Sequence, residues 1–177
     1  LVVLFVPLII ISIIIVIDSP GASPLYTQTR VGKDGREFKF YKFRSMCANA
    51  EEKLQELLDQ NEMEGPVFKI KEDPRITRVG KFIRKTSLDE LPQLWNVFIG
   101  DMSIVGPRPE RKVIAEEYYK DLPEFEYRLK VKGGLTGYAQ IYGKYNTSPY
   151  DKLRLDLMYI ENYSFMQDIK LIILTLR

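Results

Sequence analysis

The 177-residue chain contains no histidine and a single cysteine, Cys47. Without an imidazole it cannot use histidine as a general acid or base, or as a zinc ligand. One cysteine excludes an internal disulfide and a cysteine-based metal cluster. The net charge of only +2 predicts no nucleic-acid partner. Any catalysis must rest on Asp, Glu, Arg, Lys, Ser, Thr and Tyr, a set that favours phosphate chemistry with Mg²⁺.

Charge is also absent from residues 1–17, which carry only one hydroxyl, that of Ser12. Such a segment predicts a membrane helix, although a straight helix would reach roughly 25 Å against a hydrocarbon core of ~30 Å. Pro7 should kink it, because proline removes a backbone donor and clashes with the preceding turn. Two interpretations stay open: a kinked spanning helix, or a re-entrant helix that leaves by the face it entered. A cleaved signal peptide fits less well, since a small-residue cleavage pattern is missing.

Residues 18–24 (DSPGASP) are rich in helix breakers and mark the end of this segment. We therefore expect a membrane region at 1–24 and a cytosolic, membrane-associated domain at 25–177, with both ends of the chain truncated. Residues 25–44 predict a β-hairpin that turns at Asp34-Gly35. The hairpin is basic, and basic residues directly after a membrane segment place it on the cytoplasmic side.

The remaining sequence predicts a mainly helical α+β fold with this one hairpin. Residues 131–145 are rich in glycine and predict a loop. Residues 75–85 alternate basic and apolar side chains, which suits an amphipathic helix at the membrane interface and also an ordinary solvated helix. Further helices are predicted at 46–62, 91–100, 110–122 and 150–165.

Two adjacent carboxylates, Asp89 and Glu90, can be explained by structure alone. Ser87-x-x-Glu90 has the spacing of a capping box at a helix N-terminus. Pro92 argues against that register, because its missing amide would be needed for a helical hydrogen bond. Moving the start by two residues makes Asp89 the N-cap and removes the conflict.

The same pair also fits a site for phosphate chemistry. Arg84 and Lys85 lie just before it and could neutralise phosphate oxygens. One carboxylate can attack phosphorus while its neighbour accepts a proton, and the two together can hold Mg²⁺. Arg108 follows, between two prolines that fix the flanking backbone, and suits a bidentate phosphate clamp.

These motifs resemble the bacterial sugar transferases, also called monotopic phosphoglycosyl transferases or polyprenyl-phosphate sugar phosphotransferases. The matching segments occur in family order and cover nearly the whole chain. They are TQTRVGKDGREFKFYKFRSM, TRVGKFIRKTSLDELPQLWNVFIGDMSIVGPRPE, VKGGLTGYAQIYGK and KLRLDLMYIENYSF. The resemblance implies a re-entrant helix broken near a Ser-Pro pair and a catalytic domain on the inner leaflet of the bacterial cytoplasmic membrane. This chain has Val6-Pro7 there, so the kink is kept and the hydroxyl is not.

The resemblance also implies a reaction, the transfer of a sugar-1-phosphate from a UDP-sugar to undecaprenyl phosphate with release of UMP. Such a step begins the synthesis of an exopolysaccharide, a capsule, an O-antigen or a glycoprotein glycan. The family pattern makes Asp89 the nucleophile that forms a covalent phosphosugar intermediate. Glu90 would then position Mg²⁺, held by both acids, or activate the acceptor.

Five further residues take roles from the same resemblance. Arg84 and Arg108 match phosphate-binding arginines, and Asp156 matches an acid near the active site. Lys132 and Gln140 would lie near the nucleotide. The family often carries Arg-Pro-Gly where this chain has Lys132-Gly-Gly, and a lysine makes a weaker, less directional contact than an arginine.

Two alternatives compete with this assignment. A membrane-tethered phosphotransferase could use a soluble acceptor, and a non-catalytic scaffold could use the basic helices to bind partners. The sequence leaves open which sugar is transferred and whether the protein forms a homodimer.

Overall fold

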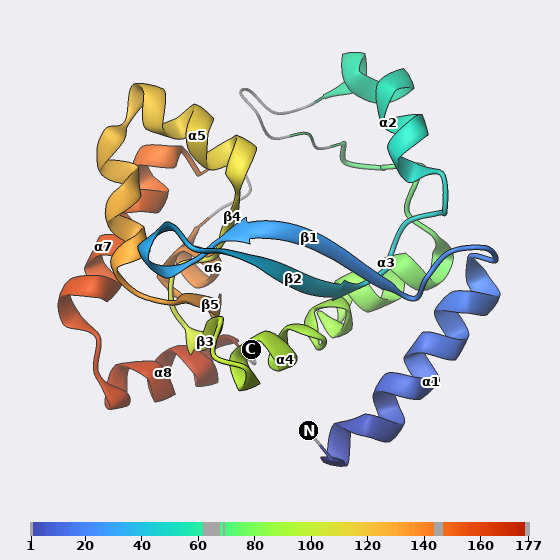
Figure 1. Ribbon diagram of the computed structural model, residues 1–177, viewed down its shortest axis with the longest axis horizontal. Helices are drawn as coiled ribbons and strands as arrows, with labels where there is room; N and C mark the ends of the chain where they lie inside the picture. Colours follow the sequence, from blue (N-terminus) through green and yellow to red (C-terminus); the bar gives the residue numbers. More distant parts are fainter. Residues whose placement is uncertain (1, 62–67, 69, 144–146, 176–177) are drawn as a thin grey trace. The chain divides into compact units, whose positions relative to one another are not determined.

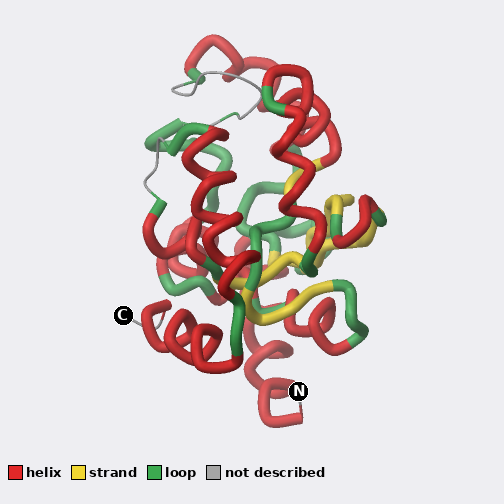
Figure 2. Tube along the Cα trace, turned by 90° about the vertical axis from the view of Figure 1, so that its left-hand side faces the viewer, coloured by secondary structure: helices red, strands yellow, loops and turns green. Residues whose placement is uncertain are grey.

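The computed structural model describes residues 2–61, 68, 70–143 and 147–175. Its helices and short strands form two compact units, one made of residues 1–27 and 41–94 and the other of residues 28–40 and 95–177. Helices predominate over strands, as Figure 2 shows. The mainly helical mixed fold predicted from the sequence is thus confirmed in outline.

The first unit begins with helix α1 (Val2–Asp18; Figure 1). Pro7 lies inside this helix and does not end it. Leu8, Ile11 and Ile15 share one face of α1 because of their spacing, and Ile15 is only 3% exposed in a core with Phe43 and Ile83. Within the described part of the chain, no helix combines the length and apolarity of a membrane span. Membrane insertion of residues 1–17 stays a prediction.

Short helices complete this unit. Helix α2 (Ala50–Leu57) and the 3₁₀ turn η2 (Leu58–Gln60) take the place of the longer helix predicted over 46–62. Helix α3 (Arg78–Lys85) confirms the amphipathic helix predicted at 75–85, and the Thr77 hydroxyl caps it by accepting a hydrogen bond from the Gly80 amide.

The predicted hairpin is present as β1 (Leu25–Val31) and β2 (Glu37–Phe43), joined by the turn η1 (Lys33–Gly35). Asp34 and Gly35 both have positive φ angles, as the Asp-Gly signal implies. A short strand, β4 (Glu110–Arg111), pairs antiparallel with β1, which gives the order β2-β1-β4.

A second sheet in the second unit was not predicted. Strands β3 (Met102–Val105) and β5 (Gly133–Thr136) pair in parallel, and α6 (Tyr138–Tyr142) follows directly. The prediction of a loop over 131–145 is therefore wrong for the residues of β5 and α6. A Cβ atom on Gly134 would lie 2.1 Å from the Gly106 amide nitrogen, so this glycine permits close strand packing rather than loop flexibility.

The C-terminal helix of the second unit contacts both strands of this sheet. Val105, Tyr159 and Leu171 form its buried core, and the Tyr159 hydroxyl donates a hydrogen bond to the Val105 carbonyl. The predicted helices at 91–100, 110–122 and 150–165 are confirmed with shifted ends. They are followed by an apolar C-terminal helix. The bounds are α4 (Gln93–Phe98), α5 (Lys112–Asp121), the 3₁₀ segment η4 (Pro123–Lys130), α7 (Pro149–Asn162) and α8 (Phe165–Thr175).

Candidate active site

The two adjacent acids lie on the 3₁₀ turn η3 (Leu88–Glu90), directly after α3 in the first unit. Ser87 precedes this turn in the left-handed conformation, with φ 56°, and its side chain makes no capping hydrogen bond. Because α4 begins only at Gln93, Asp89 is not its N-cap either. Both capping interpretations are therefore wrong.

The Asp89 carboxylate is buried, with 7% of the residue exposed. Burial raises the pKa of its carboxyl group above the ordinary value, and the positive charge of Lys42 opposes that rise only in part. Glu90 adds to the rise, whereas Arg84 lowers the pKa of Asp89. A carboxylate that is poorly solvated and close to cations suits attack on an electrophile better than one held by several hydrogen bonds.

Lys42, from strand β2, places its positive charge beside both acids. Its ammonium lies 2.9 Å from Glu90 Oε1 and 3.9 Å from Asp89 Oδ2. The sequence indicated only a basic hairpin and did not distinguish Lys42 from the other cations there.

Arg84 stands in the last turn of α3, in the same unit as the acid pair. Its Nε donates a hydrogen bond of 2.8 Å to the Ser45 hydroxyl, which fixes the guanidinium beside β2. The first unit therefore brings together three of the predicted site residues, Arg84, Asp89 and Glu90, and adds Lys42.

This cluster offers hard oxygen ligands from only two side chains. Across the residues that the structure describes, no group of three or more potential acidic, cysteine or histidine ligands occurs. Two adjacent carboxylates nevertheless fit Mg²⁺, which is commonly bound by one or two carboxylates while substrate phosphates and water complete its shell. Asp89 and Glu90 are the residues that would hold it.

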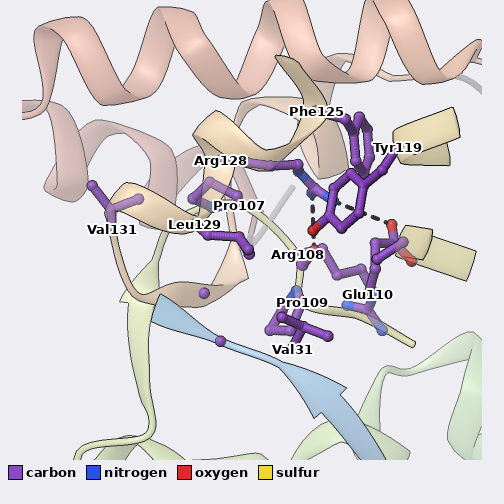
Figure 3. A pocket seen from close by; sticks show the side chains of 13 residues that line it. Val31, Pro107, Arg108, Pro109, Glu110, Tyr119, Phe125, Arg128, Leu129 and Val131 are labelled. Carbon is purple, nitrogen blue, oxygen red and sulfur yellow. Dashed lines mark hydrogen bonds and ion pairs between the residues drawn. The ribbon is translucent and has the colours of Figure 1, made fainter. Parts of the chain in front are cut away.

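The second unit contains the other predicted residues. Arg108 lies in the loop between β3 and β4, where its carbonyl accepts a hydrogen bond of 2.9 Å from Arg128 Nη2 (Figure 3). Arg128 also pairs with Asp156 through Nε and Nη2, at 2.8 and 2.7 Å. Asp156 is only 1% exposed. Arg128, which the sequence analysis missed, therefore connects two of the predicted residues.

Glu110 forms ion pairs with two cations of the second unit, Arg128 and Lys152. Burial alone would raise the pKa of Glu110, but the charges of Lys152 and Arg128 outweigh it and hold the pKa below its ordinary value. Burial also raises the pKa of Asp156, which Arg128 opposes. Lys152 forms a close ion pair with Glu110.

Lys132 and Gln140 occupy different places in the same unit. Lys132 is exposed, and its ammonium lies 3.6 Å from where a Cβ on Gly100 would be. Gln140 is in α6, and both polar atoms of its amide are buried without a hydrogen-bond partner among the described residues.

Comparison with known proteins identifies the family. The whole chain, residues 1–177, matches the family model described as bacterial sugar transferase. The chain belongs to this family. This membership confirms the resemblance that the motifs indicated.

Several curated members of the family are similar to the chain over most of its length. The galactosyl transferase CpsE of Streptococcus agalactiae is 49% identical over 91% of this chain and 35% of the relative. The UDP-galactose-lipid carrier transferase of Erwinia amylovora is 44% identical over 93% and 35%. The UDP-glucose:undecaprenyl-phosphate glucose-1-phosphate transferase of Escherichia coli K12 is 42% identical over 93% and 34%. The chain thus spans about a third of the length of these relatives.

Proposed function

We propose that this chain is the catalytic part of an enzyme that transfers a sugar-1-phosphate from a UDP-sugar to undecaprenyl phosphate. The observation that carries the proposal is the pair of buried Asp89 and half-buried Glu90 beside Lys42, in a family whose curated members include enzymes named for this transfer. The product would serve polysaccharide synthesis at the cytoplasmic face of a bacterial membrane, with residues 1–24 as the anchor.

The first chemical step is attack by an Asp89 carboxylate oxygen on the phosphorus that carries the sugar. A bond forms between this oxygen and phosphorus, and the bond from phosphorus to the bridging oxygen breaks, so that UMP leaves with the electron pair. Lys42 offsets negative charge where the anionic nucleophile meets the anionic donor, because its ammonium lies within 4 Å of both acids. When bound by Asp89 and Glu90, Mg²⁺ would neutralise the donor's diphosphate.

The second step returns the enzyme to its starting state. An oxygen of the acceptor's phosphate attacks the same phosphorus, the bond to Asp89 breaks, and the sugar diphosphate lipid is formed. Glu90 is placed to accept a proton from an acceptor phosphate that arrives protonated, because it adjoins Asp89 and shares Lys42 with it. Arg84 and Arg108 bind phosphate oxygens in this proposal.

The decisive experiment uses the full-length protein in membranes or nanodiscs. UDP-galactose, UDP-glucose and UDP-N-acetylgalactosamine, each labelled in the sugar, are supplied with undecaprenyl phosphate. We expect at least one label to enter an organic-soluble diphosphate lipid, with one UMP released per lipid formed. Label that enters only water-soluble products would favour the phosphotransferase with a soluble acceptor.

Asp89→Asn tests the covalent step and separates an enzyme from a scaffold. The amide is a far weaker nucleophile, so we expect transfer to fall by at least about a thousandfold. Intact-protein mass spectrometry after mixing with donor alone should find a phosphosugar adduct on the wild type and none on the variant. Asp59→Asn, which changes an exposed acid of the same unit, should behave as wild type. Normal turnover by Asp89→Asn would refute the mechanism.

A further inference from the structure

In the loop that carries Arg108, each backbone carbonyl of residues 107–109 accepts a hydrogen bond. Two prolines deprive it of backbone donors, so its shape depends on what its carbonyls accept. The three consecutive carbonyls accept hydrogen bonds of 2.9 Å, from the Gly134 amide at Pro107, from Arg128 Nη2 at Arg108 and from Arg30 Nη1 at Pro109. Two of the three donors are arginine side chains from distant parts of the chain.

The arginine that holds the Arg108 carbonyl is itself fixed by buried acids. Asp156 accepts a hydrogen bond from Arg128 Nε and forms an ion pair with Nη2, and Glu110 lies 3.6 Å from Nη1. The Arg128 side chain is 4% exposed and that of Asp156 is 1% exposed. Arg128 also lies over the ring of Phe125, at 4.5 Å from the centroid. The guanidinium of Arg128 is therefore contacted along its edge by the two acids and on one face by the Phe125 ring.

This arrangement explains why an ion pair is retained in the interior. Apolar residues of similar volume would fill the same space without the cost of burying two charges. They could not, however, donate a hydrogen bond to the buried side of the Arg108 carbonyl, which would lose its partner. Asp156 orients the guanidinium that makes this bond, and its own carboxylate is engaged by that guanidinium.

We propose that Arg128 and Asp156 are positioning residues, which set the direction of Arg108 by holding its carbonyl, and that Asp156 does not itself touch the substrate. The proposal rests on the proposed function, in which Arg108 binds a phosphate. It replaces the expectation from the family resemblance that Asp156, an acid near the active site, binds the substrate. The residue would act through Arg128 and the loop backbone.

The first test measures the loop directly and does not depend on activity. Amide hydrogen exchange is followed by mass spectrometry for peptides covering residues 104–112, in the full-length protein. Asp156→Ala should speed exchange there by about tenfold, because Arg128 is no longer oriented and the loop loses roughly the stabilisation of one hydrogen bond, the one to the Arg108 carbonyl. Asp156→Asn, which keeps one acceptor, should have a smaller effect. Glu161→Gln, an exposed acid on the same helix, should leave exchange unchanged.

The second test is a double-mutant cycle on kcat/KM for UMP release. Arg108→Ala and Asp156→Asn are measured singly and together. A phosphate-binding group displaced by about 1 Å can cost ~100-fold. We therefore expect Asp156→Asn, which only displaces Arg108, to lose up to that much, and Arg108→Ala, which removes the group, to lose at least that much. In the Arg108→Ala background, Asp156→Asn should change kcat/KM by less than about threefold, because its effect passes through Arg108.

Each outcome decides the proposal. Non-additive kinetics together with faster exchange support it. Additive losses would mean that Asp156 acts independently of Arg108, and unchanged exchange in Asp156→Ala would mean that it does not hold the loop; either result overturns the proposal. If Asp156→Ala does not fold, Asp156→Asn and Arg128→Lys carry the exchange measurement. A wild type that releases no UMP would refute the proposed function, while the exchange result would still judge the positioning role.

Discussion

For Gly80→Ala, helix propensity predicts an increase in the free energy of unfolding, whereas tertiary packing predicts a decrease. Gly80 lies inside α3, where replacing glycine by alanine ordinarily stabilises a helix by about 1 kcal/mol. The structure predicts the reverse. A Cβ at this position would lie 2.0 Å from the Ser45 carbonyl oxygen, 2.7 Å from the Ser45 carbonyl carbon and 2.9 Å from Thr77 Oγ1. The two nearest atoms belong to the backbone, so the clash cannot be relieved by a side-chain rotation.

The size of the effect follows from what must move. To reach an ordinary contact, α3 must shift by more than an ångström from the end of β2. The shift would strain the hydrogen bond from the Thr77 amide to the Ser45 carbonyl, at 3.1 Å, and that from Arg84 Nε to the Ser45 hydroxyl, at 2.8 Å. Overpacking costs about 1–3 kcal/mol and each lost hydrogen bond about 1 kcal/mol. After subtracting the gain in propensity, we expect a net destabilisation of about 2 kcal/mol.

Thermal unfolding followed by circular dichroism in nanodiscs measures this loss. For a chain of this size, about 2 kcal/mol corresponds to a decrease in Tm of roughly 4–8 °C. Lys81→Ala, at an exposed position of the same helix, is the matched control and should change Tm by less than about 2 °C. A Gly80→Ala variant that unfolds at a higher temperature than the wild type would refute the argument from packing. Activity should fall together with stability, because Arg84 follows on the same helix.

Two further substitutions test single charges in the first unit. The carboxyl group of Asp73 has a lowered pKa because Arg75 donates hydrogen bonds to it, so its contribution to stability should be complete above its ordinary pKa of about 4 and lost as pH falls below that value. Asp73→Asn should cost about 3 kcal/mol at neutral pH. In urea unfolding measured at a series of pH values, the variant should lose less stability than the wild type below about pH 5, and an equal loss would contradict this. Lys42→Met should slow formation of the phosphosugar adduct by about a hundredfold in rapid-quench mass spectrometry, with Lys39→Met, exposed on the same strand, as control. An adduct that forms at the wild-type rate in Lys42→Met would show that this ammonium does not assist the attack.

Elements with strong local signals could be predicted from the sequence. The hairpin follows from Asp34-Gly35, and α3 from the basic and apolar pattern of residues 75–85. The parallel pair β3–β5 could not be predicted, because each strand has only four residues and its glycines serve close packing that only the partner strand explains. The turn η3 was also missed. Ser87 adopts a left-handed conformation without being glycine or asparagine, which the capping pattern could not indicate.

The candidate site was predictable as a set of residues but not as an arrangement. Asp89, Glu90 and Arg84 are close in sequence, so one turn and one helix bring them together. Lys42 and Arg128 were missed because their partners lie 48 and 28 residues away, and local patterns contain no information on such pairings. Asp156 was indicated only by the family resemblance, and the sequence could not show that its contact is with Arg128.

The three pinned carbonyls of the Arg108 loop have a consequence for protein engineering. A designer who transplanted Pro-Arg-Pro into another scaffold would carry over the prolines but leave behind the two guanidinium donors and the glycine amide that hold them. The graft would therefore need Arg30, Arg128 and their acids to reproduce the shape of the loop. What looks like a short linear motif is portable only as a three-dimensional fragment assembled from several distant segments.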